Sequence, residues 1–122
     1  MPKPNNYQFI NLDYLNALLE EDNETKVTML SILIDELPSE IKRINDAFSV
    51  SNYKEIKNAS HKLKSTLAFV GNQKMATANK TIEQIAKEEQ GFEKLPDLIK
   101  IMNDMQPAIL EEVKKAVQDL AK

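Results

Sequence analysis

Residues 24–49 read ETKVTMLSILIDELPSEIKRINDAFS, and apolar side chains recur in this stretch every three or four residues. This spacing predicts one long amphipathic helix, with Asn23 as its N-cap. The apolar face consists of Val27, Leu30, Ile34, Leu37, Ile41, Ile44 and Phe48. Pro38 removes one helical hydrogen bond, but the apolar pattern stays in phase across it. We therefore expect a single kinked helix rather than two separate helices.

A shorter helical pattern precedes this stretch, at residues 12–21. Asn11 is a candidate N-cap, and the pattern breaks at Asp22. Its apolar face consists of Leu12, Leu15, Leu18 and Leu19. Residues 1–8 are mostly polar and contain two prolines. We expect them to form a flexible leader ahead of a single helical domain over residues 9–122.

Three more helical patterns follow, over residues 53–70, 73–89 and 95–120. The short breaks between them contain residues that suit helix ends. These residues are Asn52, Gly71, Asn72, Gly91 and Pro96. Glu55 stands where it could complete a capping box with Asn52. Apolar spacing near 3.5 residues and short connections predict an all-α fold, an up-down antiparallel four-helix bundle with a short extra N-terminal helix.

The composition limits the function. The chain has 122 residues, a net charge of −3 and no cysteine. An acidic chain lacks the basic surface that nucleic-acid binding requires, and the absence of cysteine excludes disulfides and thiolate metal sites. The apolar runs are too short to span a bilayer, and the N-terminus does not resemble a signal peptide. We therefore expect a cytoplasmic protein without nucleic-acid binding or membrane insertion.

His61 is the only histidine of the chain, and it lies in the helical pattern of residues 53–70. On a helical wheel, the core face of this helix consists of Ile56, Ala59, Leu63, Leu67 and Val70. His61 falls on the opposite side, one turn away from Lys57, Lys64 and Ser65. We therefore expect the imidazole to be accessible to solvent or to another protein.

These surroundings suit a histidine that carries a phosphoryl group. The unperturbed pKa of histidine is about 6.5, so neutral imidazole is present near neutral pH. Lys64 offers positive charge to a phosphoryl group, and Lys57 flanks the ring from the preceding turn. Ser65 and Ala68 are small and leave the surface open. Residues 53–70 carry a net charge of +3 and the rest of the chain −6, which favours docking of an acidic partner on this helix.

The run Ser60-His61-Lys62-Leu63-Lys64-Ser65, followed by Gly71, resembles the signature of histidine-containing phosphotransfer (HPt) domains. The resemblance extends over about residues 9–120. Two positions depart from the family pattern: Ser60 stands where alanine is common, and Ser65 stands where glycine is common. Serine is still small enough to leave space beside the histidine.

The resemblance implies a role for each motif residue. His61 would be the phosphoacceptor, at Nε2, and Lys64 would stabilise the phosphoryl group. Leu63 and Gly71 would be structural. The protein would accept the phosphoryl group from a phospho-aspartate of a response-regulator receiver domain and pass it to the aspartate of a second receiver. It would be a carrier rather than an enzyme with autokinase activity.

The resemblance also implies the partners. A hybrid sensor histidine kinase and response-regulator receivers would exchange the phosphoryl group with this chain. The Mg²⁺ would belong to the receiver, so the chain would need no cofactor or metal of its own. We expect a monomer, because single domains of this family are usually monomeric.

The docking surface is a further hypothesis. Its candidate residues are Lys57, Lys62, Ser65 and Ala68 around the histidine, and Leu15, Leu18 and Leu19 on the short first helix. The first helix has more leucines than a narrow core seam requires. The alternative, that all three leucines belong to the core, remains open.

Other function classes fit less well. A di-iron or zinc bundle needs several converging ligands, but Asn58 precedes His61 by three positions and no second histidine exists. The chain has no glycine-rich phosphate loop and no hydrolase motif. The alternative that remains is a bundle of this fold that binds a partner without carrying phosphate.

Overall fold

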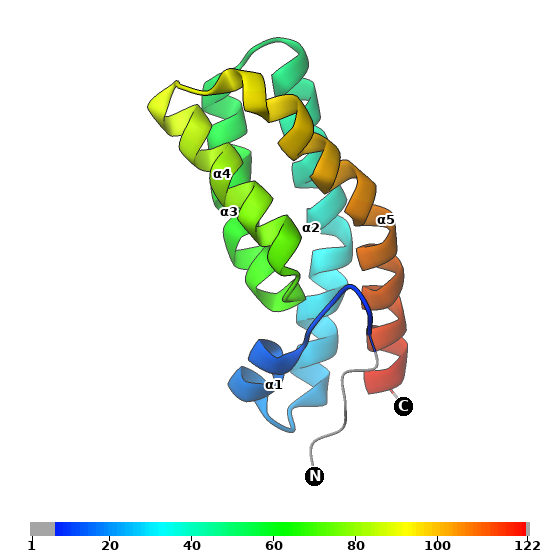
Figure 1. Ribbon diagram of the computed structural model, residues 1–122. Coiled ribbons are helices and arrows are strands. Elements are labelled where there is room, and N and C mark those ends of the chain that lie inside the picture. Colours follow the sequence, from blue (N-terminus) through cyan, green and yellow to red (C-terminus); the bar gives the residue numbers. More distant parts are fainter. Residues whose placement is uncertain (1–6, 122) are drawn as a thin grey trace.

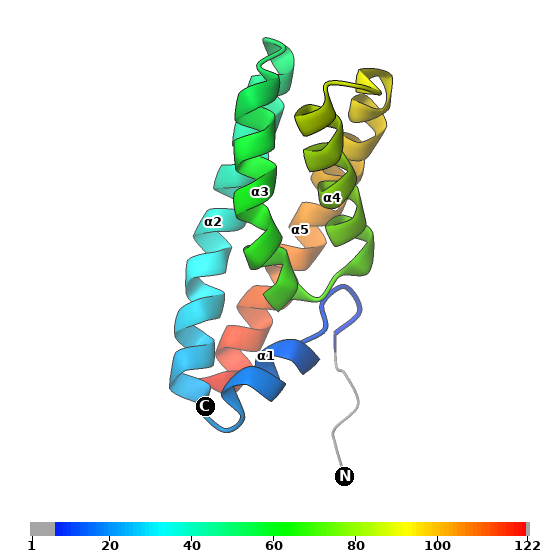
Figure 2. The ribbon, with the colours of Figure 1, turned by 90° about the vertical axis from the view of Figure 1, so that its left-hand side faces the viewer.

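The structure is a computed structural model that describes residues 7–121. The helices are α1 (Asp13–Leu19), α2 (Asn23–Ser49), α3 (Tyr53–Val70), α4 (Gln73–Glu88) and α5 (Leu95–Leu120). A short 3-10 turn, η1 (Phe92–Lys94), precedes α5. Helices α2 to α5 run alternately up and down as a bundle (Figure 1), and α1 lies across one end of it (Figure 2). The predicted all-α fold with an extra N-terminal helix is confirmed.

Helix α2 supplies a wide apolar face to the core. Its buried apolar side chains are Leu30, Leu33, Leu37, Ile41, Ile44 and Ala47. Three predicted core positions are only partly buried, namely Val27, Ile34 and Phe48. The buried face is turned slightly from the predicted one, because α2 packs against both α3 and α5. It remains one helix through Pro38, as predicted.

Side-chain caps fix where the helices begin. Asp22, rather than the predicted Asn23, caps α2, because its Oδ1 accepts a hydrogen bond from the backbone N–H of Thr25 at 3.1 Å. Asn52 caps α3 and Asn72 caps α4, as predicted. Each of these side chains satisfies a backbone donor that the first helical turn leaves unpaired.

The C-terminal ends agree with the sequence in one case and differ in another. Gly71 ends α3 with a φ of 70°, as predicted. The C-cap of helix α4 is instead Glu89, which itself adopts a φ of 55°. The expectation that Gly91 closes α4 is therefore wrong, and Gly91 precedes η1. The capping box is also incomplete, because the Glu55 carboxylate accepts a hydrogen bond from Arg43 Nε at 2.8 Å.

The N-terminal segment, residues 7–12, forms a strap that lies against the bundle before α1 begins (Figure 1). Within the leader predicted over residues 1–8, residues 1–6 lie outside the described part of the chain. Tyr7 donates a hydrogen bond from its hydroxyl to Asp119 of α5 at 2.8 Å. Helix α1 is shorter than the predicted 12–21 and covers only Asp13–Leu19.

Candidate functional site

Helix α3 presents His61 on its outer side. All five predicted core positions of this helix are buried, namely Ile56, Ala59, Leu63, Leu67 and Val70. The His61 side chain is 74% exposed. The predicted orientation of the helix is therefore confirmed, and the imidazole is accessible from solvent.

A carboxylate from the neighbouring helix contacts the imidazole. The Nδ1 atom of His61 lies 2.7 Å from Oε2 of Glu83, which belongs to α4. When His61 is neutral, this geometry favours the tautomer in which Nδ1 carries the proton and donates it to the carboxylate. Nε2 then holds the free electron pair, so it is the ring nitrogen that can react with an electrophile.

Sequence reasoning missed Glu83, although a signal for it existed. Helices α3 and α4 are antiparallel and meet at Gly71 and Asn72. Positions at equal distance from that turn face each other, and His61 and Glu83 lie ten and eleven residues from it. Predicting the contact required the assumption that these two helices pair directly.

A groove between α3 and α4 surrounds the imidazole. It is lined by His61, Lys64, Lys80, Glu83, Gln84, Lys87 and Glu88. Lys64 lies here, as the sequence predicted. Lys80 and Lys87 were not predicted, because they come from α4. The groove thus carries three lysines and two glutamates beside one accessible histidine.

Comparison with known protein families identifies the domain. The family model described as the Hpt domain matches residues 28–122. The chain belongs to the Hpt domain family. Hpt domains are histidine phosphocarriers of two-component phosphorelays, and they interact with receiver domains. No curated protein and no solved structure matches the chain.

Within residues 7–121, no helix is both long and apolar enough to cross a membrane. The same residues contain no group of three or more His, Cys, Asp or Glu side chains arranged to hold a metal ion. The strap and α1 precede the matched region of the Hpt domain.

One lysine predicted for receiver docking is engaged within the Hpt domain itself. Lys62 Nζ lies 3.2 Å from Oε1 of Glu40, whose side chain is only 4% exposed. The other oxygen of Glu40 accepts a hydrogen bond from Arg43 at 2.7 Å. Lys62 therefore ties α3 to α2, and this pairing competes with any contact to a partner. Lys57 is partly buried, whereas Lys64 is exposed.

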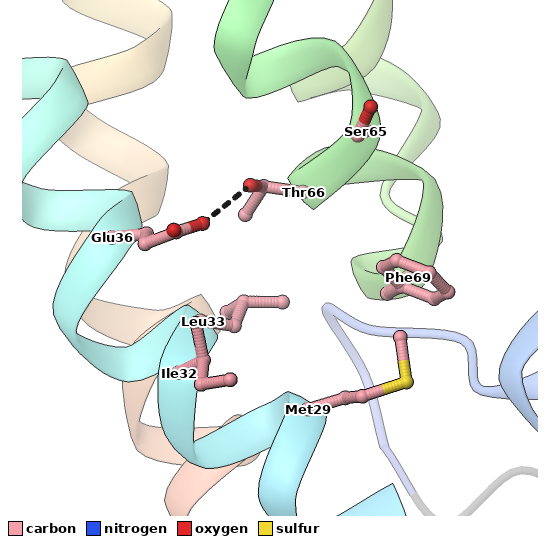
Figure 3. A pocket seen from close by; sticks show the side chains of 7 residues that line it. All are labelled: Met29, Ile32, Leu33, Glu36, Ser65, Thr66 and Phe69. Atoms are coloured by element: carbon pink, nitrogen blue, oxygen red, sulfur yellow. Dashed lines mark hydrogen bonds between the residues drawn. The ribbon is translucent and has the colours of Figure 1, made fainter.

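An apolar groove lies on the other flank of α3, between α3 and α2. Its lining side chains are Met29, Ile32, Leu33, Glu36, Ser65, Thr66 and Phe69. Figure 3 shows the side chains that α2 and α3 contribute to its two sides, with Thr66 donating a hydrogen bond to Glu36 at 3.3 Å. Ser65 lies one helical turn from His61, so the apolar groove begins close to the imidazole. Ala68 is exposed on the same helix.

Helix α1 extends this apolar surface, but not through all of the predicted leucines. Leu15 is fully buried, so its predicted docking role is wrong and the core alternative holds for it. Leu18 is 54% exposed and Leu19 is partly buried. Tyr14, which was not predicted, is 53% exposed, and its ring centroid lies 5.6 Å from that of Phe69.

The exposed and partly buried apolar side chains of α1 and of the groove together form what we call the apolar platform, defined as Tyr14, Leu18, Met29, Ile32 and Phe69. Ile32 is 51% exposed. Large apolar side chains that gather on one surface indicate an interaction site more often than isolated ones do. The platform and the groove at His61 therefore lie on the two flanks of α3.

Proposed function

We propose that His61 is the phosphoacceptor of this Hpt domain and that it relays a phosphoryl group between two receiver aspartates. The observation that carries the proposal is the pairing of an accessible imidazole with Glu83, 2.7 Å from Nδ1, inside the family's signature. Glu83 leaves Nε2 as the nucleophile, and the 74% exposed side chain lets a receiver's active site approach it.

The transfer needs no bond-making group besides the imidazole. The Nε2 electron pair attacks phosphorus, an N–P bond forms, and the bond between phosphorus and the aspartate oxygen breaks, so that the aspartate leaves as a carboxylate. The imidazole becomes a positively charged phosphoimidazolium. Glu83 accepts a hydrogen bond from the Nδ1–H of this cation, and its negative charge stabilises the cation. Transfer to the second receiver reverses these steps.

The surrounding charges fit this chemistry. Lys64 lines the groove with His61 and supplies positive charge to the phosphoryl oxygens. The Mg²⁺ that offsets phosphoryl charge during in-line transfer belongs to the receiver. The chain then acts without autokinase activity and without a cofactor of its own, and the phosphoryl group enters the relay through a hybrid sensor histidine kinase.

We also propose that the receiver docks on the apolar platform as a one-to-one complex with monomeric protein. The apolar groove starts one turn from His61, at Ser65, so a receiver whose active site covers the imidazole extends over it. If Leu18→Ala left receiver affinity unchanged while Lys64→Ala weakened it, α1 would have no part in docking.

The proposal is tested by incubating the protein with a panel of phosphorylated receivers and Mg²⁺. We expect the label to move to this chain, to be acid-labile and base-stable, and to be absent from His61→Gln. A folded protein that binds a receiver and never takes up label would favour the alternative, a binding module that carries no phosphate.

A further inference from the structure

The Glu112 carboxylate of α5 binds three backbone amides of the strap. Glu112 accepts hydrogen bonds from the backbone N–H groups of Gln8 at 2.8 Å, Phe9 at 2.6 Å and Ile10 at 3.1 Å. Three consecutive amides thus converge on both oxygens of one side chain. An ionised carboxylate is an acceptor at every lone pair, and its hydrogen bonds to N–H donors are stronger than neutral ones.

Beyond Glu112, the strap is fastened to the turn between α3 and α4. The side-chain amide of Asn72 donates a hydrogen bond to the carbonyl oxygen of Phe9 at 2.7 Å. The backbone N–H of Asn11 donates one to the carbonyl oxygen of Val70 at 2.8 Å. Gly71 permits this close approach, because a Cβ at that position would lie 2.1 Å from the Asn11 carbonyl oxygen. The path of the strap is therefore narrowly determined.

The strap leads directly into α1. The Asn11 side chain accepts a hydrogen bond from the backbone N–H of Asp13 at 2.8 Å, at the first residue of the helix. Helix α1 has 7 residues, which is too short for a helix to be stable by its own hydrogen bonds. Its placement therefore depends on its two connections and on the buried Leu15.

We propose that Glu112 is a positioning residue for receiver docking. By holding the strap it holds α1, and α1 carries Tyr14 and Leu18, which complete the apolar platform. Glu112 itself lies on α5, which packs against α2 and α4 and takes no part in the groove at His61. This inference rests on the proposed function, because it names the element that sets receiver affinity.

The test compares Glu112→Gln with Glu111→Gln. Both changes remove one negative charge from neighbouring positions of α5, but Glu111 is exposed and makes none of the strap contacts. Hydrogen exchange should become faster at the amides of residues 8–19 in Glu112→Gln alone, while the core amides of α2 to α5 keep their protection.

The functional readouts separate docking from chemistry. Phosphorylation of His61 by phosphoramidate, a small donor that needs no docking, should proceed at the wild-type rate in both variants. Transfer from a phosphorylated receiver should show a KM that is higher by about tenfold in Glu112→Gln, with kcat unchanged. Tyr14→Ser combined with Leu18→Ser should reproduce that KM without faster exchange in the strap.

Adding Glu112→Gln to the Tyr14 and Leu18 changes should raise KM no further, since all three act through one surface. Faster exchange in the strap with a KM equal to that of Glu111→Gln would overturn the inference, and so would a fully additive triple variant. If Glu112→Gln does not fold, a wild-type KM in the Tyr14 and Leu18 variant overturns it. Absence of His61 labelling from both donors in wild type would instead reject the proposed function.

Discussion

At the residue scale, the contact between His61 and Glu83 favours the tautomer of the neutral imidazole in which Nε2 is unprotonated. Glu83→Ala removes the acceptor for Nδ1–H, so the proton distributes over both nitrogens and the phosphorylated ring loses its counter-charge. A hydrogen bond to a charged group contributes about 1.5–3 kcal/mol, which corresponds to a transfer rate lower by about 10- to 100-fold. Nitrogen NMR of the imidazole measures the tautomer, and single-turnover transfer measures the rate.

Glu88→Ala is the matched control for this change. Glu88 lines the same groove, but its carboxylate accepts a hydrogen bond from Gln84 rather than from His61. It should keep the wild-type tautomer. If Glu83→Ala also kept the wild-type nitrogen shifts and transfer rate, the role assigned to Glu83 would have to be abandoned.

Two leucines test the orientation of the helices at single positions. Leu63 is fully buried, so Leu63→Ala should lower the free energy of unfolding by about 2–5 kcal/mol. Leu18 is 54% exposed, and Leu18→Ala should change it by no more than about 0.5 kcal/mol. Urea denaturation of both variants measures the difference. Equal losses would mean that one of the two side chains is placed incorrectly.

At the scale of elements, the junction between α3, α4 and the strap depends on Gly71. Gly71 and Gly91 have φ angles of 70° and 80°, so alanine meets a similar conformational penalty at both positions. At Gly71 the new Cβ would also lie 2.1 Å from the Asn11 carbonyl oxygen, whereas at Gly91 its nearest neighbour would be 3.7 Å away. Gly71→Ala should therefore lower the free energy of unfolding by about 1–3 kcal/mol more than Gly91→Ala.

Urea denaturation of the two alanine variants isolates the close approach of the strap, because the conformational penalty cancels in the comparison. Gly71→Ala should also speed hydrogen exchange at residues 8–12. Equal destabilisation by the two variants would show that the strap does not pass this close to the end of α3.

The strap should also respond to alkaline pH through Tyr7. Partial burial, the hydrogen bond to Asp119 and the charges of Asp119 and Glu112 raise the pKa of Tyr7 from 10.0 to about 12. Lys115 Nζ, 6.0 Å from the ring centroid, is the facing cation. Because the folded state holds the phenol proton more tightly, this contribution to stability is complete below pH 10 and is lost as pH rises towards about 12.

The measurement is a tyrosine absorbance titration of wild type minus Tyr7→Phe, together with thermal unfolding of both between these pH values. The difference titration should have its midpoint near pH 12, and the stability advantage of wild type should shrink as pH rises above 10. A midpoint at the ordinary tyrosine value would show that Tyr7 is not held against α5.

Elements could be predicted where local rules decide them. The four bundle helices follow from apolar periodicity, and Asn52, Asn72 and Gly71 act at the helix ends as their chemistry indicates. The strap could not be predicted, because Glu112 binds backbone amides more than a hundred residues away. Nearly every residue has a backbone N–H, so the sequence does not show which of them a distant carboxylate binds. The end of α4 could not be predicted either. The left-handed residue that ends a helix is usually glycine, which favoured Gly91, but here Glu89 adopts this conformation.

At the scale of the whole molecule, α3 lies at the centre of the candidate site. Helix α4 completes the groove at His61, and α1 and α2 complete the apolar platform. The sequence identified the side that α3 contributes, since the spacing within one helix determines which residues share a face. It did not identify Glu83, Lys80 and Lys87 of α4, because their approach depends on how two helices pair. It also left Leu15 open between docking and the core, because a leucine on a short helix has no sequence feature that separates core from surface.

The distribution of charged and apolar side chains over the molecule supports separate tasks for the two flanks of α3. The flank towards α4 holds the charged groove, where we propose that His61 exchanges the phosphoryl group. The flank towards α2 and α1 holds the apolar platform, which is the proposed docking surface for the receiver. Variants on the platform should therefore change receiver affinity, and variants in the groove should change the rate of transfer at saturation.

The most direct test of the central claim is single-turnover transfer from a phosphorylated receiver to wild type and to His61→Gln, with the phosphorylated atom located by phosphorus NMR. We expect acid-labile phosphate on Nε2 of His61 in wild type. We expect none in His61→Gln, whose melting temperature should stay close to that of wild type because the side chain is 74% exposed. Phosphate that persists in His61→Gln, or that resides on Nδ1, would contradict the proposed role of His61.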